Sequence, residues 1–398
     1  MEKVKNKVIV WGGDNFNTLG LMRELGAADL ELLFLVKGRA RFATKSKYCK
    51  KYVETQSIES GYKYLLENFS EEKIKPIIIT PSDEIITFID KHKEEMEKVF
   101  IIPGTNQKGN IEKYIDKNEM TLLAEEIGIT CPRSIKASKN SDISKVEYPC
   151  LIKPSHEKSG HYNEFKFKIC KNKKKLKRVL RYVRKDSEFI LQQYIPKKIE
   201  LLVYGGRMWD GNTIIAGGFF KDRYSDSGAA SHGYLTGDIS NCVDISKISN
   251  FVERIGYYGL FSVEYGLFED KAYFFEINLR NDGTSHYFYQ LGANIPLAYV
   301  YSSAGLDYST IPTKITNEKN WFIDELFDVE NVISGKVKRK QWKKDKAEAT
   351  VFKYYDKDDI LPYETVKKSR FKQLIQEMVL KRFRLYIIFI LDKLGLRK

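Results

Sequence analysis

The sequence has few cysteines and histidines and no long hydrophobic run. Its five cysteines are widely spaced along 398 residues and form no Cys-x-x-Cys pair, which excludes a disulfide framework and a zinc knuckle. The longest apolar run, residues 385–391, is too short for a membrane-spanning helix, and the apolar stretch at 8–11 is too short for a secretory leader. By contrast, 42% of the residues are hydrophobic and 13% are aromatic, enough for a sizeable core. We therefore expect a folded cytoplasmic protein of two to three domains with reduced thiols.

Positive charge is concentrated at the carboxyl-terminal end. The chain holds 67 Lys and Arg against 53 Asp and Glu, a formal net charge of +14. Residues 331–398 hold 19 basic and 8 acidic residues, which leaves residues 1–330 close to neutral at +3. The basic excess thus predicts an anionic partner for the last segment, and the near-neutral body argues against a nucleic acid.

The first hundred residues alternate short apolar runs with helical periodicity. This order predicts a parallel sheet with helical crossovers. Gly12 and Gly13 follow the first run, but the sequence lacks the G-x-G-x-x-G spacing of a dinucleotide site, so a tight turn is the better interpretation. The predicted strands are 8–11, 32–36, 76–80 and 99–102, and the predicted helices are 18–25, 59–69 and 82–96.

The central region changes to paired strands. A helix at 116–127 ends at Gly128, a residue typical of helix termini. A very basic helix at 171–185 interrupts the strands, and its lysines are most simply a solvated face. The predicted strands are 149–153, 164–170, 189–194, 200–204, 213–220, 259–266 and 271–278.

Polar side chains alternate with apolar ones at the end of the last of these strands. Period two places Glu276, Asn278 and Arg280 on one face. Glu264 lies twelve residues before Glu276, and residues 269–271 between them predict a hairpin turn. Two carboxylates and an amide oxygen suit Mg²⁺. The alternative is a surface hairpin with solvated acids, which we disfavour because an unpaired Glu276 between apolar neighbours would cost several kcal/mol.

Two lysines occupy positions suited to phosphate. Lys117 begins a predicted helix, and Lys153 ends an apolar strand before a candidate mobile loop at 155–161. Each alone is most often a surface lysine. Beside a magnesium site they predict point charges that neutralise a polyphosphate.

With these motifs the chain resembles an ATP-grasp enzyme, and within that superfamily the carboxylate-amine ligases that include D-aspartate ligases. The resemblance covers roughly residues 4–310. It implies a mixed α/β and α+β fold in which two β-rich lobes hold ATP and Mg²⁺. The implied units are a Rossmann-like subdomain at 1–112, an ATP-grasp domain at 113–310 and a basic extension at 311–398 that ends in an amphipathic helix.

The resemblance also implies individual roles. Lys117 and Lys153 correspond to the two nucleotide lysines, and Glu200 to the carboxylate that binds the ribose hydroxyls. Independently of the resemblance, Lys221 and Arg223 lie just after a predicted strand, a position from which they could meet phosphate or an acidic substrate. The hinge that reads adenine corresponds to Gln192, Gln193, Tyr194 and Ile195, and the metal ligands to Glu264, Glu276 and Asn278.

The implied reaction is the ADP-forming coupling of a carboxylate to an amine. ATP converts the carboxylate to an acyl phosphate, which the amine then attacks, and Arg280 is the candidate catalytic residue. A salt bridge from Arg280 to Glu276 or Asp282 is nearly as plausible a role. His232 and His286 are more plausibly structural than catalytic, and the loop at 281–287 is a candidate lining for the acceptor pocket.

Two alternatives to this activity stay open. One is an ATP-grasp carboxylase or phosphoribosyl-type ligase, which differs in the acceptor. The other is a non-catalytic scaffold that associates with membranes.

The terminal segment carries its own prediction. Residues 336–346 contain seven basic residues, and cationic residues flank the apolar run at 385–391. A helix with this pattern can lie on the anionic inner face of the cell membrane or pack on the body, and we weight the two equally. A cell-envelope precursor as substrate rests on this segment and on the resemblance.

Overall fold

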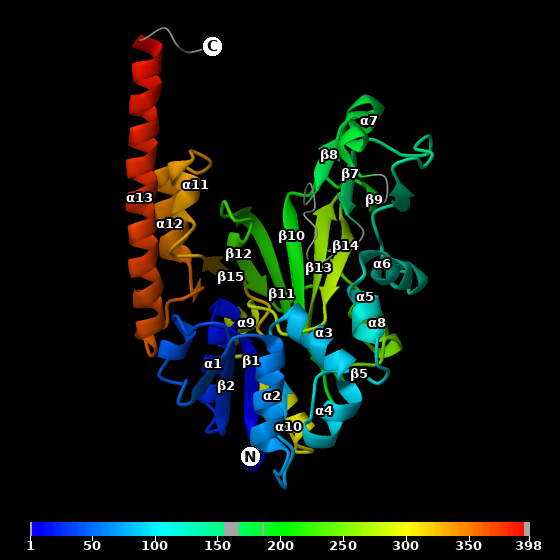
Figure 1. The fold of residues 1–398 in the computed structure, drawn as a ribbon, viewed down its shortest axis with the longest axis vertical. Helices are drawn as coiled ribbons and strands as arrows, with labels where there is room; N and C mark the ends of the chain where they lie inside the picture. Colours follow the sequence, from blue (N-terminus) through cyan, green and yellow to red (C-terminus); the bar gives the residue numbers. More distant parts are fainter. Residues whose placement is uncertain (1, 155–166, 185–186, 394–398) are drawn as a thin grey trace.

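The computed structural model describes residues 2–154, 167–184 and 187–393 of the chain, with side chains described as far as residue 376. The loop predicted at 155–161, and the first part of the strand predicted at 164–170, lie outside these residues. Three sheets make up the body (Figure 1).

The first sheet is parallel, as predicted. Its strand order is β3-β2-β1-β4, and α1 packs against β1. The strands are β1 (Val8–Gly13), β2 (Leu32–Lys37), β3 (Tyr52–Thr55) and β4 (Ile77–Ile79), and the helices that follow them are α1 (Phe16–Gly26), α2 (Ile58–Phe69), α3 (Asp83–Lys91) and α4 (Lys93–Val99).

Two predictions in this region are wrong. The strand at 99–102 is reduced to a single bridge between Ile101 and Ile77, because β4 offers only three residues for pairing. The helix at 82–96 is two helices, interrupted at His92, whose backbone leaves the helical region while its ring stacks on Phe88 at 4.3 Å. Ser82 caps α3 by accepting a hydrogen bond from the N–H of Ile85.

The large sheet has the order β14-β13-β10-β11-β12-β15-β16, with β5 paired to β13. Its pairs are antiparallel except for β15 and β16. The last two strands come from the predicted extension at 311–398, so that segment completes the sheet. The strands are β5 (Gly104–Thr105), β10 (Ile199–Arg207), β11 (Thr213–Tyr224), β12 (Ala230–Thr236), β13 (Tyr257–Phe268), β14 (Lys271–Asn278), β15 (Asn320–Ile323) and β16 (Val351–Phe352).

Successive side chains of β10 point to opposite faces of the large sheet and enter two different hydrophobic cores. Leu202 and Tyr204 point into the core shared with the parallel sheet. Leu201 and Val203 point to the opposite core. The helices near these faces are α5 (Asn110–Ile115), α6 (Lys117–Glu126), α8 (Ile245–Arg254), α9 (Ser285–Gln290) and α10 (Ile295–Ser303).

The third sheet forms a small lobe with the order β6-β9-β7-β8, and α7 contacts its edge strand β8. Figure 1 shows this lobe above the end of the large sheet where β13 and β14 lie. The basic helix is shorter than the predicted 171–185. The elements are β6 (Ser134–Ser138), β7 (Cys150–Pro154), β8 (Lys168–Cys170), α7 (Lys173–Tyr182) and β9 (Glu188–Gln193).

The last helix of the chain, α13 (Ile360–Lys393), is long and packs against the body only along its first part (Figure 1). It contacts η1 (Ala43–Lys45) near its start. It then runs past α11 (Val329–Ile333) and α12 (Arg339–Glu348), and its last turns extend beyond the body (Figure 1). Among the described residues, no helix is long and apolar enough to cross a membrane.

Candidate active site

Two glutamates face each other across neighbouring strands. Glu264 on β13 lies directly opposite Glu276 on β14, and Ser262 lies opposite Asn278. The turn between the strands bends at Glu269 and Asp270, both left-handed with φ of 48° and 57°, as a two-residue hairpin requires. A register shift between Glu264 and Tyr265 then brings the two carboxylates opposite each other on one face of the sheet.

Charge gathers around this acid pair. Burial raises the pKa of Glu276, and the facing Glu264 raises it further. Lys117, Lys153 and Arg280 oppose the rise, so all three lie close enough to act on the carboxylate. A divalent cation would relieve the repulsion between the acids, and their oxygen donors are those Mg²⁺ prefers. The residues present thus fit a magnesium ion.

Lys221 completes this face of the sheet from β11. Its Nζ donates to Oε1 of Glu264 at 3.1 Å, and its side chain is only 10% exposed. In register, Lys221 lies opposite Glu200 on β10. A buried cation is therefore fixed beside Glu264, one of the three candidate metal ligands.

Lys153 reaches the site from the small lobe. It lies near the end of β7, and its Nζ donates to Oε1 of Gln192 at 3.2 Å. Gln192 in turn donates to the hydroxyl of Ser134 at 2.9 Å. Burial lowers the pKa of Lys153 to about 8, and Lys117 adds to that effect. Lys117 is the first residue of α6, which Asp116 caps.

The predicted adenine hinge, residues 192–195, begins with the last two residues of β9. The N–H of Gln193 donates to the carbonyl of Arg133, and the N–H of Tyr194 donates to the carbonyl of Pro149. These two backbone donors are therefore used within the protein.

The sequence interpretation missed Lys197. Its Nζ pairs with Glu200, the predicted ribose ligand, and lies 4.6 Å from the ring centre of Phe275. Burial lowers the pKa of Lys197 to about 8, although Glu264 opposes the shift. Its position three residues before Glu200 was the available signal, but a lysine in a loop carries no distinctive pattern.

Arg280 is held by several acceptors. Its guanidinium donates to Asp83 at the start of α3 at 3.1 and 3.3 Å, to Asp282 at 3.2 Å and to the amide oxygen of Asn278 at 3.3 Å. Although burial lowers the pKa of Arg280, Asp282 and Asp83 raise it overall. The salt bridge expected as an alternative role therefore goes to Asp282 and Asp83.

Arg223 does not face phosphate, contrary to the sequence interpretation. It donates two hydrogen bonds to Asp328 and one to Asp345, each 2.8 Å long, and so ties β11 to the segments around α11 and α12. His232 is hydrogen-bonded to Asp222 at 2.7 Å, and its ring stacks on Trp321 with the ring centres 5.4 Å apart. Burial, and then Arg23, lower the pKa of His286 well below its ordinary value.

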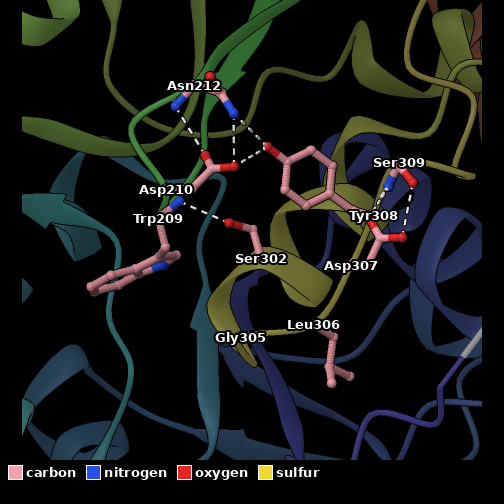
Figure 2. A pocket seen from close by; sticks show the side chains of 9 residues that line it. All are labelled: Trp209, Asp210, Asn212, Ser302, Gly305, Leu306, Asp307, Tyr308 and Ser309. Atoms are coloured by element: carbon pink, nitrogen blue, oxygen red, sulfur yellow. Dashed lines mark hydrogen bonds between the residues drawn. The ribbon is translucent and has the colours of Figure 1, made fainter.

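A separate open pocket of about 730 Å³ lies at the turn between β10 and β11. Figure 2 shows Asp210 bonded to Tyr308 and Asn212 there, with Trp209 beside them. None of the predicted site residues lines this pocket. It is thus distinct from the acid pair.

A parallel sheet, a large and mainly antiparallel sheet and a small lobe make up the fold, and the ATP-grasp fold expected from the sequence is confirmed. Solved structures share it. An L-amino acid ligase from Bacillus licheniformis matches with a TM-score of 0.58 and 15% identity, over 77% of this chain and 78% of that one. An N5-carboxyaminoimidazole synthetase from Staphylococcus aureus matches with a TM-score of 0.63 and 15% identity, over 84% and 88%.

Curated relatives are more similar in sequence. A formate-dependent phosphoribosylglycinamide formyltransferase from Bacillus velezensis is 26% identical over 226 residues, 54% of this chain and 56% of the relative. The carbamoyl phosphate synthase large chain from Saccharolobus solfataricus is 24% identical over 253 residues, 58% of this chain and 22% of the relative. The chain thus spans about half the length of the first relative and less of the second. No family model matches the chain.

Proposed function

We propose that this protein is an ATP- and Mg²⁺-dependent, ADP-forming ligase that couples a carboxylate to an amine. The observation that carries the proposal is the pairing of Glu264 with Glu276 on adjoining strands, with Lys221 bonded to the first and Lys153 acting on the second. The relatives and structural neighbours, which are ATP-grasp enzymes, support it.

The residues at this site suit phosphoryl transfer to a carboxylate. The substrate carboxylate oxygen attacks the γ-phosphorus of ATP, ADP leaves, and the amine nitrogen then attacks the acyl carbon and expels phosphate. Lys117 and Lys153 would neutralise the phosphate oxygens. Mg²⁺ held by Glu264, Glu276 and Asn278 would supply further positive charge at the transferred group.

Arg280 has a role that its contacts define. Its guanidinium bonds Asn278, Asp282 and Asp83, so it fixes the end of β14 and the loop that follows. From there it would stabilise the acyl phosphate. Because the carboxylates hold its pKa high, it stays charged throughout.

The structural neighbours and relatives suggest which substrates to test. The L-amino acid ligase among the neighbours favours an amino acid as the amine that is coupled. The formate-dependent transferases and the carboxyaminoimidazole synthetases favour a second candidate, in which formate or bicarbonate is activated and a phosphoribosyl compound is the acceptor. A cell-envelope precursor as acceptor rests on the basic terminal segment and on the family resemblance.

An ADP-release assay tests the activity. Purified protein with ATP and Mg²⁺ is screened against amino acids, formate and bicarbonate, with hydroxylamine present to trap an acyl phosphate as a hydroxamate. We expect ADP and hydroxamate with at least one carboxylate. Absence of ADP release with every carboxylate would support the scaffold alternative instead.

Two variants make the assay specific. Glu264→Gln keeps the shape of the side chain but removes the charge that pairs with Lys221, and should abolish ADP release. Glu253→Gln, on the exposed face of α8, makes the same chemical change away from the site and should leave activity unchanged. Equal activities in the two variants would contradict the assignment.

We also propose that the protein is cytoplasmic and lies on the inner face of the cell membrane through α13. The observation behind this is the cationic sequence around the apolar run at 385–391, in the part of α13 that extends beyond the body (Figure 1). Substitution of Lys381, Arg382 and Arg384 by Gln should reduce flotation with anionic vesicles. Unchanged flotation would favour a helix that packs without lipid.

A further inference from the structure

Helix α7 of the small lobe presents a second cationic surface. Six of its ten residues are basic and none is acidic. Every one of these basic side chains is exposed, whereas the apolar residues of the helix are buried in the lobe. The basic residues are Lys173, Lys174, Lys175, Lys177, Arg178 and Arg181.

Helical periodicity arranges these charges. Leu176, Val179 and Leu180 form the buried stripe of α7. With 3.6 residues per turn, the face opposite this stripe centres on Lys174, Arg178 and Arg181. Tyr182, four residues after Arg178, is 73% exposed. The outward face therefore combines closely spaced cations with one amphipathic aromatic side chain.

The position of α7 relates it to the end of the chain. Figure 1 shows α7 and the last turns of α13 at the same end of the longest axis of the molecule. The sequence of those last turns holds the apolar run at 385–391 with Arg382, Arg384 and Lys393 around it. One flat anionic surface could therefore contact both elements.

We propose that α7 is a membrane-binding surface that, together with the end of α13, turns the small-lobe end of the molecule toward an anionic lipid bilayer. Each basic residue near such a surface is attracted to it, and tyrosine favours the interface between lipid and water. A bilayer explains both elements, because its anionic headgroups attract the basic residues and its apolar interior accepts the apolar run at 385–391. A nucleic acid would bind the basic residues but offers no apolar phase for that run. The proposal shares its partner with that for α13 but rests on charges of a different lobe.

Sedimentation with vesicles tests the proposal on the full chain. The probe is a set of phosphatidylglycerol vesicles, with phosphatidylcholine vesicles as the uncharged comparison. The triple variant Lys174→Gln, Arg178→Gln and Arg181→Gln should lower the partition coefficient on anionic vesicles by roughly 100-fold. The matched control carries the same loss of charge on other exposed loops: Lys73→Gln, Lys108→Gln and Lys314→Gln.

The control should lower binding by less than about threefold, because distant charges are screened within a Debye length. Equal loss in both triple variants would overturn the proposal, since net charge alone would explain it. A charge-conserving variant, Lys174→Arg with Arg178→Lys and Arg181→Lys, should bind as the wild type does.

A nucleic acid is the competing partner. Fluorescence anisotropy with a labelled DNA duplex of matched concentration gives the comparison, and tighter binding to the duplex than to the anionic vesicles would overturn the proposal. ADP release in solution should be the same for the α7 variant and the wild type. A wild type that releases no ADP would refute the proposed ligase activity, while the vesicle result would still decide the role of α7.

Discussion

Replacement of Glu276 by Gln separates function from stability. In the free protein this carboxylate faces Glu264 directly across the strands, and like charges in that arrangement destabilise a sheet by about 0.2–1 kcal/mol. Gln has the same shape without the charge. We therefore expect the variant to be as stable as the wild type, or more stable by up to about 1 kcal/mol, while ADP release falls at least ~100-fold.

The difference in unfolding free energy between the wild type and Glu276→Gln should also depend on pH, in a direction that the pKa of Glu276 determines. Burial and Glu264 raise the pKa of Glu276 above its ordinary value of 4.5. A carboxyl whose pKa is raised in the folded state contributes stability at low pH, and this contribution is lost as the pH rises through the raised value. The stability of the wild type relative to Glu276→Gln should thus fall as the pH rises above 4.5, and then level off.

Urea unfolding at several pH values, followed by far-UV circular dichroism, measures this difference. The Glu253→Gln variant is again the matched control and should show no such trend. A Glu276→Gln protein that is less stable than the wild type by more than about 1 kcal/mol at neutral pH would refute the reasoning, because it would mean that Lys117, Lys153 and Arg280 outweigh the facing acid.

Three further predictions concern buried cations. Because burial lowers the pKa of Lys153 to about 8, the affinity for ADP measured by calorimetry should fall as the pH rises through that value, and Lys153→Met should remove this dependence. Lys221→Met leaves Glu264 without its partner at 3.1 Å and should lower the unfolding free energy by about 1–3 kcal/mol, whereas unchanged urea unfolding would contradict the ion pair. Arg23 is 0% exposed and Asp359 only 2%, so Arg23→Met should cost about 3–5 kcal/mol and the added change Asp359→Asn should recover part of it in the same assay.

The hairpin of β13 and β14 could be predicted from sequence because its signals are local. Two polar residues, Glu269 and Asp270, separate two mainly apolar strands, which is enough to predict a turn between them. The pairing of Glu264 with Glu276 does not follow from the turn alone, because the register shifts by one residue between Glu264 and Tyr265. Without this bulge Glu264 would lie opposite Phe275, and the two acids would point to different faces of the sheet. The assignment of ligand roles to them still rests on the resemblance and stays a prediction.

Contacts between distant segments could not be predicted in this way. Arg280 meets Asp83 across 197 positions of sequence, and no periodic pattern relates a strand end to a helix start that far away. The strands β15 and β16 are four and two residues long, too short for an apolar run to identify them. Only their pairing with β12 and with each other makes them strands.

The buried guanidinium of Arg23 contacts both the segment just before α13 and the loop that follows Arg280. Arg23 of α1 donates to the side chain and carbonyl of Asp359 and to the carbonyl of Tyr354, just before α13 begins. Its Nη1 also lies 3.3 Å from Nε2 of His286, which belongs to the candidate acceptor loop at 281–287. A deletion that removed Asp359 together with α13 would expose Arg23 and disturb that loop. Loss of activity in such a protein would therefore not show whether α13 binds lipid. Substitution of exposed charges on α7 in the full chain avoids this confusion, because the buried residues of α7 belong to a core separate from that of Arg23.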